Sequence, residues 1–240
     1  MTDRGRPALR QSRDRLTIGP SSMRWEEGRL IIEINEIGAL PMVSRVRGRI
    51  TVTPSALTSV ELPLTEDGSH IWRPFAPSCD IEVALEARGW QWEGHGYFDA
   101  NFGTRALEQD FASWTWGRFP LSDGSACFYD ATRKDGTKLA CGVHFDAEGM
   151  ARMMNLPPPA SIQRSLWMLE RSTRADAGYK AQEVLPMLDA PFYNRSAVRT
   201  KIHGEETVGV HEALDLGRYG SALLKPMIAL RVPRRRGWSL

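Results

Sequence analysis

Short apolar stretches separated by turn residues constrain this chain more than any other feature. Residues 29–34, 45–53 and 81–87 are apolar and rich in β-branched side chains, and such stretches predict strands. Asp-Gly pairs lie between stretches of this kind and favour tight hairpins, because glycine accepts a positive φ. The pairs are Asp67-Gly68, Asp123-Gly124 and Asp135-Gly136. The pattern predicts antiparallel strands joined by hairpins.

The clearest run of hairpins lies between residues 111 and 145. Strands are expected there over 111–119, 126–132 and 138–145, with the Asp-Gly pairs as their turns. Further strands are expected over 150–155 and 165–171, and only 175–188 could be helical, although Gly178 and Pro186 weaken a helix. Many short strands with regular turns are typical of a β-sandwich or a barrel.

Composition excludes several classes of protein. Hydrophobic residues make up 42% and charged residues 25% of the chain, as in folded globular proteins and unlike disordered ones. No apolar run approaches the roughly 18 residues that a membrane-spanning helix needs. Cys79, Cys127 and Cys141 lack CxxC spacing, so neither a disulfide framework nor a zinc site is indicated. A cytoplasmic location is the simplest interpretation.

Both ends of the chain are basic although the formal net charge is only +2. Residues 1–22 are polar and interrupted by glycine and proline, so we expect an extended basic arm that packs little. Basic ends can attract anionic lipid headgroups or nucleic acid, but short Arg-rich ends are more commonly solvated tails. The arginines concerned are Arg4, Arg6, Arg10, Arg13 and Arg15 at the start, and Arg231, Arg234, Arg235 and Arg236 near the end.

The densest aromatic and polar stretch is 90–119. If it is a strand, Tyr97, Asp99 and Asn101 share one face, which places a carboxyl beside a phenol. In an apolar interior, desolvation would raise the pKa of Asp99 and keep it protonated, as a proton donor requires. The alternative is a turn role for Asp99 between Gly96 and Gly103, and spacing alone favours it.

Other candidate motifs carry less chemistry. Trp114 and Trp116 share a face, which is more typical of core packing than of a site. The histidines lack metal-ligand spacing, so they are interpreted as surface or structural residues, and no metal or cofactor is expected. No GxGxxG, Walker loop or GxSxG elbow supports nucleotide or acyl-transfer chemistry. The histidines are His70, His95, His144, His203 and His211.

Four separated stretches together resemble the carotenoid 1,2-hydratase family, also called hydroxyneurosporene synthase. They are LTIGPSSMRWEEGRLIIEINE (16–36), HIWRPFAP (70–77), GHGYFDANFGTRALEQDFASWTWGR (94–118) and VHEALDLGRY (210–219). The resemblance covers nearly the whole chain. It implies a mainly β protein with two lipocalin-like antiparallel β-barrels, the first incomplete. The expected segments are the arm 1–22, the remainder of a first β domain over 23–88 and a second β domain over 89–240.

The resemblance also implies an activity and its residues. The family adds water to the terminal C1–C2 double bond of acyclic carotenoids such as lycopene or neurosporene, in the carotenoid biosynthesis of phototrophic bacteria and without a cofactor. Its functional aromatic, phenol and acid correspond to Trp72, Tyr97 and Asp99. Asp99 would protonate the alkene, and the rings would stabilise the carbocation. Asn101 and Trp92 are candidate substrate-binding residues.

Three alternatives remain open from the sequence. The chain could be a non-catalytic lipocalin-like binder of a hydrophobic polyene, or a related enzyme that guides another cationic rearrangement. Family members usually carry a further N-terminal segment, so the chain could also be an inactive truncated fragment. The expected partners are an acyclic carotenoid and water, with no nucleic acid. A nearly insoluble substrate further suggests peripheral contact with the inner membrane through the Arg-rich ends.

Overall fold

The computed structural model describes residues 5–38, 43–86 and 90–224 and consists mainly of antiparallel strands. An eight-stranded sheet contains the first half of the chain, with β7 paired on one edge to β5 and β6 and on the other to β8. Its strands are β1 Leu9–Gln11, β2 Arg15–Ile18, β3 Ser21–Glu26, β4 Arg29–Ile37, β5 Arg45–Pro54, β6 Leu62–Pro63, β7 His70–Leu85 and β8 Trp90–Gly103. A 3-10 helix, η1 Arg6–Ala8, precedes β1.

A seven-stranded sheet follows in the order β12-β11-β10-β9-β17-β16-β15. Its strands are β9 Phe111–Leu121, β10 Gly124–Arg133, β11 Lys138–Asp146, β12 Ala151–Met153, β15 Gln182–Asp189, β16 Tyr193–Ile202 and β17 Glu205–Asp215. A separate pair is formed by β13 Pro159–Ile162 and β14 Arg171–Arg174. Two one-turn helices, α1 Leu107–Asp110 and α2 Leu216–Tyr219, flank β9 and β17. Among the described helices, none is long and apolar enough to cross a membrane.

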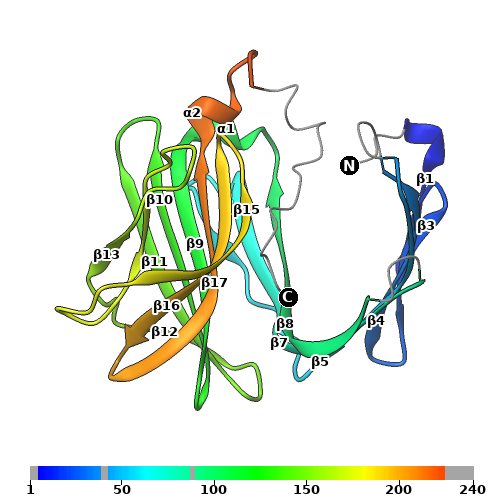
Figure 1. Cartoon of the computed structure of the whole chain (residues 1–240), viewed down its shortest axis with the longest axis horizontal. Helices are drawn as coiled ribbons and strands as arrows, with labels where there is room; N and C mark the ends of the chain where they lie inside the picture. Colours follow the sequence, from blue (N-terminus) through cyan, green and yellow to red (C-terminus); the bar gives the residue numbers. More distant parts are fainter. Residues whose placement is uncertain (1–4, 39–42, 87–89, 225–240) are drawn as a thin grey trace.

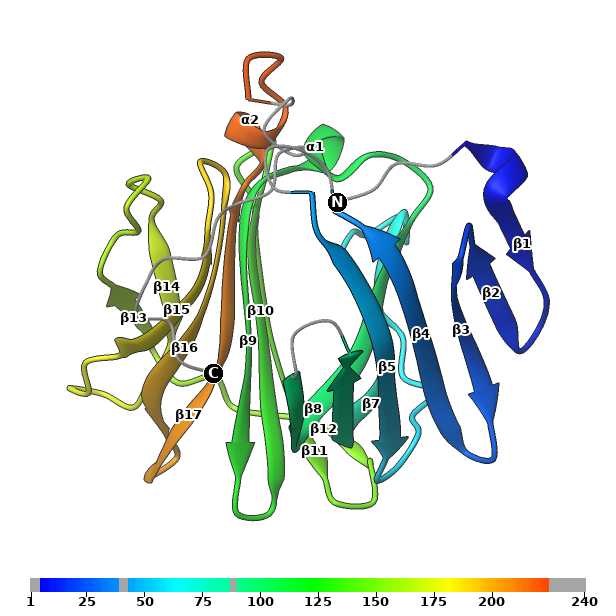
Figure 2. The same ribbon diagram turned by 45° about the vertical axis from the view of Figure 1, so that its right-hand side comes forward.

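The sheets lie side by side at β7 and β8. Figure 1 shows these strands next to the second sheet, while the first sheet curves away through β5 and β4 to β1. Figure 2 shows the same fan of strands turned toward the viewer. In the described part of the chain the pairing runs from β1 to β8 and from β12 to β15 without returning to its start. The predicted antiparallel β architecture is confirmed, whereas barrel closure is not observed among these strands.

Most strand predictions are confirmed. The Asp-Gly turns join β6 to β7, β9 to β10 and β10 to β11, and Gly68 and Gly136 have φ values of 67° and 87°. The strands expected over 29–34, 45–53, 111–119, 126–132 and 138–145 are present, and the one expected over 150–155 is shortened to β12. The strand expected over 81–87 is the end of β7; residues 87–89 lie outside the described residues.

Three segments differ from the local expectations. Within the expected arm 1–22, Leu9–Gln11, Arg15–Ile18 and Ser21–Ser22 lie in the paired strands β1, β2 and β3, although β1 is exposed along its length. Residues 165–170 are a loop, and the strand β14 begins only at Arg171. The segment 175–188, the one place where a helix was considered, contains most of strand β15, which pairs with β16. Pro186 disfavours a helix interior there, as the sequence analysis noted.

The expected domain boundary at residue 88 falls between two paired strands. β8 pairs with β7 from Trp90 to Gly103, so one sheet continues across that position. The division into a first and a second β domain stays a prediction. The main core cluster joins β7 to the second sheet and contains Trp72, Phe111, Trp114, Trp116 and Tyr129, among others. It surrounds the candidate site.

Candidate active site

Strands β7 and β8 bring the predicted aromatic residue and the predicted acid into contact. Trp72 on β7 pairs with Asn101 on β8, so its indole reaches across to the neighbouring inward position. Trp72 is 1% exposed, and its Nε1–H donates a hydrogen bond of 2.8 Å to Oδ2 of Asp99. Tyr97 lies two residues before Asp99 and therefore on the same face of β8. The three residues selected from the sequence lie together.

The second sheet supplies two further rings to this site. The ring centroids of Tyr97 and Trp116 are 4.9 Å apart, and those of Trp72 and Tyr129 are 5.9 Å apart. Trp116 on β9 also meets Trp72 at 6.4 Å in an edge-on arrangement. Trp116 is buried, as its predicted packing role requires, and it also forms part of the aromatic wall around Asp99.

The electrostatics of Asp99 favour its neutral form. Burial raises the pKa of the Asp99 carboxyl, and the hydrogen bond from Trp72 and the charge of Arg195 only partly oppose this effect. Burial likewise raises the pKa of the Tyr97 phenol, so that ring stays uncharged and electron-rich. The arrangement therefore places a carboxyl group with a raised pKa beside aromatic π-faces, and such faces can stabilise a cation.

The two predicted substrate-binding residues lie in different places. Asn101 is exposed at the edge of the site, and its Oδ1 accepts a hydrogen bond of 3.4 Å from the Tyr129 hydroxyl. Trp92 is 43% exposed and seven positions from Asp99, which corresponds to roughly 23 Å along the strand and to the opposite face. The structure brings Asn101 to the site but does not bring Trp92 there.

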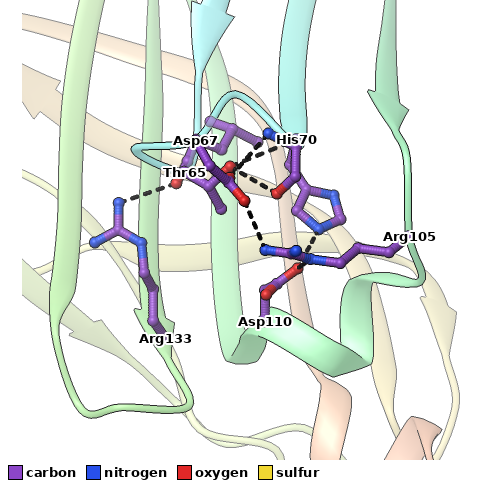
Figure 3. A network of polar contacts seen from close by, with 8 residues as sticks. Thr65, Asp67, His70, Arg105, Asp110 and Arg133 are labelled. Atoms are coloured by element: carbon purple, nitrogen blue, oxygen red, sulfur yellow. Dashed lines mark hydrogen bonds and ion pairs between the residues drawn. The ribbon is translucent and has the colours of Figure 1, made fainter.

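A polar network supports β7 next to the site (Figure 3). His70 is 1% exposed, and its Nε2 lies 2.7 Å from Oδ2 of Asp110. Arg105 donates to the same Asp110 oxygen at 2.6 Å and to Asp67 at 2.9 Å. His70 is therefore one of the structural histidines that the sequence analysis allowed for, and the structure adds its partner, Asp110. Alternation along β7 could have indicated its orientation, since His70 lies two residues before Trp72 on the same face.

Two charged residues near the site also escaped the sequence analysis. Arg195 on β16 donates from Nη2 to the Tyr97 hydroxyl at 3.2 Å, and its Nη1 lies 3.3 Å from Oε1 of Glu212 on β17. Nothing local marks these residues in the sequence, because Arg195 and Tyr97 are 98 positions apart. Only the packing of the two sheets brings them together.

The fold and the site define a class of protein: a mainly β protein that holds a partly buried carboxyl group with a raised pKa among electron-rich rings, an arrangement suited to acid catalysis on an apolar substrate. Comparison with known proteins is more specific. The family model described as carotenoid hydratase CrtC matches residues 1–240, and the chain belongs to that family.

Individual relatives agree with this membership. The chain is 61% identical over 239 residues to the acyclic carotenoid 1,2-hydratase of Cereibacter sphaeroides, covering 100% of this chain and 85% of the relative. It is 56% identical to the enzyme of the same name from Rhodobacter capsulatus, covering 99% of this chain and 85% of the relative. Among solved structures, the crystal structure of CghA with Sch210972 is similar with a TM-score of 0.47 and 10% identity, over 80% of this chain and 66% of that one.

Proposed function

We propose that this chain adds water to the terminal C1–C2 double bond of acyclic carotenoids such as lycopene and neurosporene, with Asp99 as the acid. The family and the names of its relatives support the reaction. The observation that carries the assignment of the acid is the enclosed Asp99 carboxyl, held by the Trp72 indole and with a raised pKa.

The proposed reaction begins with proton transfer from the Asp99 carboxyl to C2, which leaves a tertiary carbocation at C1. The faces of Trp72 and Tyr97 stabilise that cation, by about 2 kcal/mol or more where water is excluded. The Trp72 N–H stabilises the carboxylate that remains. Water then adds at C1 and returns a proton to Asp99, so the product is the 1-hydroxy carotenoid and the acid is regenerated.

The roles of the two flanking residues are part of this proposal. Asn101 lies at the exposed edge of the site, where its amide can orient the attacking water. Trp92, on the far face of β8, would contact the polyene only outside the immediate site.

The test is incubation of the chain with lycopene, followed by mass and absorption analysis of the products. The unmodified chain should add one or two molecules of water, and Asp99→Asn should abolish product while retaining polyene binding. Asp80→Asn is the matched control, because Asp80 is a carboxylate on the neighbouring strand whose side chain is 76% exposed. Product formation by Asp99→Asn at the rate of the unmodified chain would contradict the assignment. Binding without turnover by the unmodified chain would favour the non-catalytic binder.

We also propose that the chain works in the cytoplasm and collects its substrate at the surface of the inner membrane. The loop between β13 and β14 carries three consecutive exposed apolar residues, Leu166, Trp167 and Met168, which are 64%, 43% and 57% exposed. Interfacial tryptophan and basic residues favour contact with anionic lipid. Arg6, Arg10, Arg13 and Arg15 are exposed, whereas Arg4, Arg231, Arg234, Arg235 and Arg236 lie outside the described residues.

Flotation with anionic liposomes at low salt tests the membrane contact. The chain should float with the vesicles, and Trp167→Ser should reduce the floating fraction. The charge-dependent part should weaken as salt is added, because screening shortens the range of the attraction. Absence of flotation at low salt would exclude this mode of contact.

A further inference from the structure

A straight row of cross-strand neighbours on the second sheet faces Tyr97. Arg195 pairs with Glu212, Glu212 with Trp116, and Trp116 with Tyr129. Directly opposed residues on adjacent strands point to the same face of a sheet. Trp116 contacts the Tyr97 ring, so Arg195 and Glu212 belong to the face that closes over the candidate site.

The ion pair in this row is bound directly to the site. The Arg195 guanidinium donates to the Tyr97 hydroxyl at 3.2 Å while its other nitrogen lies 3.3 Å from the Glu212 carboxylate. The two side chains are 39% and 21% exposed, so they are only partly screened by solvent. This hydrogen bond holds the Tyr97 ring at its oxygen, so Arg195 itself does not cover a π-face, whereas Arg118 lies over the ring at 5.7 Å.

Building on the function proposed above, we propose that Arg195 and Glu212 are positioning residues of this active site. Arg195 fixes the Tyr97 ring against Trp116, and Glu212 cancels the guanidinium charge that would otherwise oppose a carbocation. An uncompensated guanidinium near the site would also favour the carboxylate over the acid at Asp99. Glu212 therefore favours the protonated, uncharged form of Asp99, although Glu212 does not touch the reacting atoms.

Several titratable or charged groups face Asp99 and Tyr97, and they determine which ionisations a pH titration of the site can detect. Tyrosine and cysteine side chains here remain neutral at moderate pH, because burial raises their pKa values. Of the charged groups, Arg118 lies over the Tyr97 ring at 5.7 Å and donates to the carbonyl of Pro77. The titratable and charged neighbours are Tyr97 on β8, Arg118 on β9, Cys127 and Tyr129 on β10, Tyr193 and Arg195 on β16, and Glu212 on β17. β7 contributes the neutral Trp72.

Opposite charge changes should move the titration of Asp99 in opposite directions. Glu212→Gln should lower the pKa of Asp99, because the Arg195 charge is then unopposed, and Arg195→Met should raise it. The double variant removes both charges and should titrate close to the unmodified chain. The alkaline limb of the pH–rate profile for hydration should follow these shifts, because only protonated Asp99 donates. A purely structural role would not produce shifts of opposite sign.

Carbon-13 NMR of carboxyl-labelled aspartate measures this titration without relying on activity, with Asp99→Asn used to assign the signal. Glu206→Gln is the matched control, because Glu206 lies on the same strand in an exposed pair with Arg199 at 3.7 Å, and the Asp99 signal should not move. If Glu212→Gln fails to fold, the difference in the pKa of Asp99 between Arg195→Met and the double variant measures the effect of the Glu212 charge. An unchanged Asp99 titration, or shifts of the same sign, would overturn the inference. An Asp99 that titrates at an ordinary pKa in the unmodified chain, without hydration of lycopene, would instead contradict the proposed function.

Discussion

Replacing Trp72 by phenylalanine separates the hydrogen bond to the acid from the aromatic packing. Trp72 is 1% exposed and donates to Asp99 at 2.8 Å; phenylalanine keeps a ring but has no N–H. The smaller ring leaves a cavity of roughly 40 Å³, worth about 1 kcal/mol of stability, and the lost hydrogen bond adds about 1 kcal/mol. For catalysis, a hydrogen bond to a charged group is worth about 1.5–3 kcal/mol, so hydration should slow by roughly 10- to 100-fold.

Trp114→Phe is the control for packing. Trp114 is 9% exposed and belongs to the same core cluster, so the same substitution should cost about 1 kcal/mol through the cavity that it leaves. Lycopene hydration and urea unfolding should be measured for both variants. We expect the free energy of unfolding to fall by about 1 kcal/mol more in Trp72→Phe, from the lost hydrogen bond, and the rate of hydration to fall strongly only in that variant. Equal rates in the two variants would refute the idea that the indole N–H supports the acid.

Three further predictions concern stability. Because burial raises the pKa of Asp99, the folded state disfavours the charged carboxylate, and Asp99→Asn should raise the melting temperature at neutral pH; a lower melting temperature would contradict this. Burial lowers the pKa of His211 to about 4. The stability that the neutral His211 contributes is complete above its ordinary pKa of about 6.5. The free energy of unfolding should fall by about 3 kcal/mol as the pH drops from there toward 4, because the buried imidazole must then be protonated. Urea unfolding of His211→Gln should therefore depend less on pH over that range than unfolding of the unmodified chain. A Cβ at Gly209 would lie 2.1 Å from the backbone oxygen of Arg118, so Gly209→Ala should cost about 1–3 kcal/mol, and an unchanged urea midpoint would disprove the close approach.

Local patterns were sufficient where the structure depends on near neighbours. The Asp-Gly hairpins follow from glycine conformation and β-branched stretches, so β9, β10 and β11 could be predicted. The sequence pattern did not indicate strands within 9–22 or over 182–189, where pairing with a neighbouring strand decides the conformation. Strand propensity alone does not predict such strands, because strand formation also depends on burial and on the strands available for pairing.

The candidate site divides in the same way. Alternation places Tyr97 and Asp99 on a common face of any strand that contains both, and the sequence by itself determined that much, although spacing alone favoured a turn role for Asp99. The structure places Asp99 inside strand β8. Only the tertiary structure decided that this face is covered by Trp116 and joined to the Arg195–Glu212 pair. The physical reason is that desolvation and charge pairing arise where sheets pack, between residues that no short-range pattern connects.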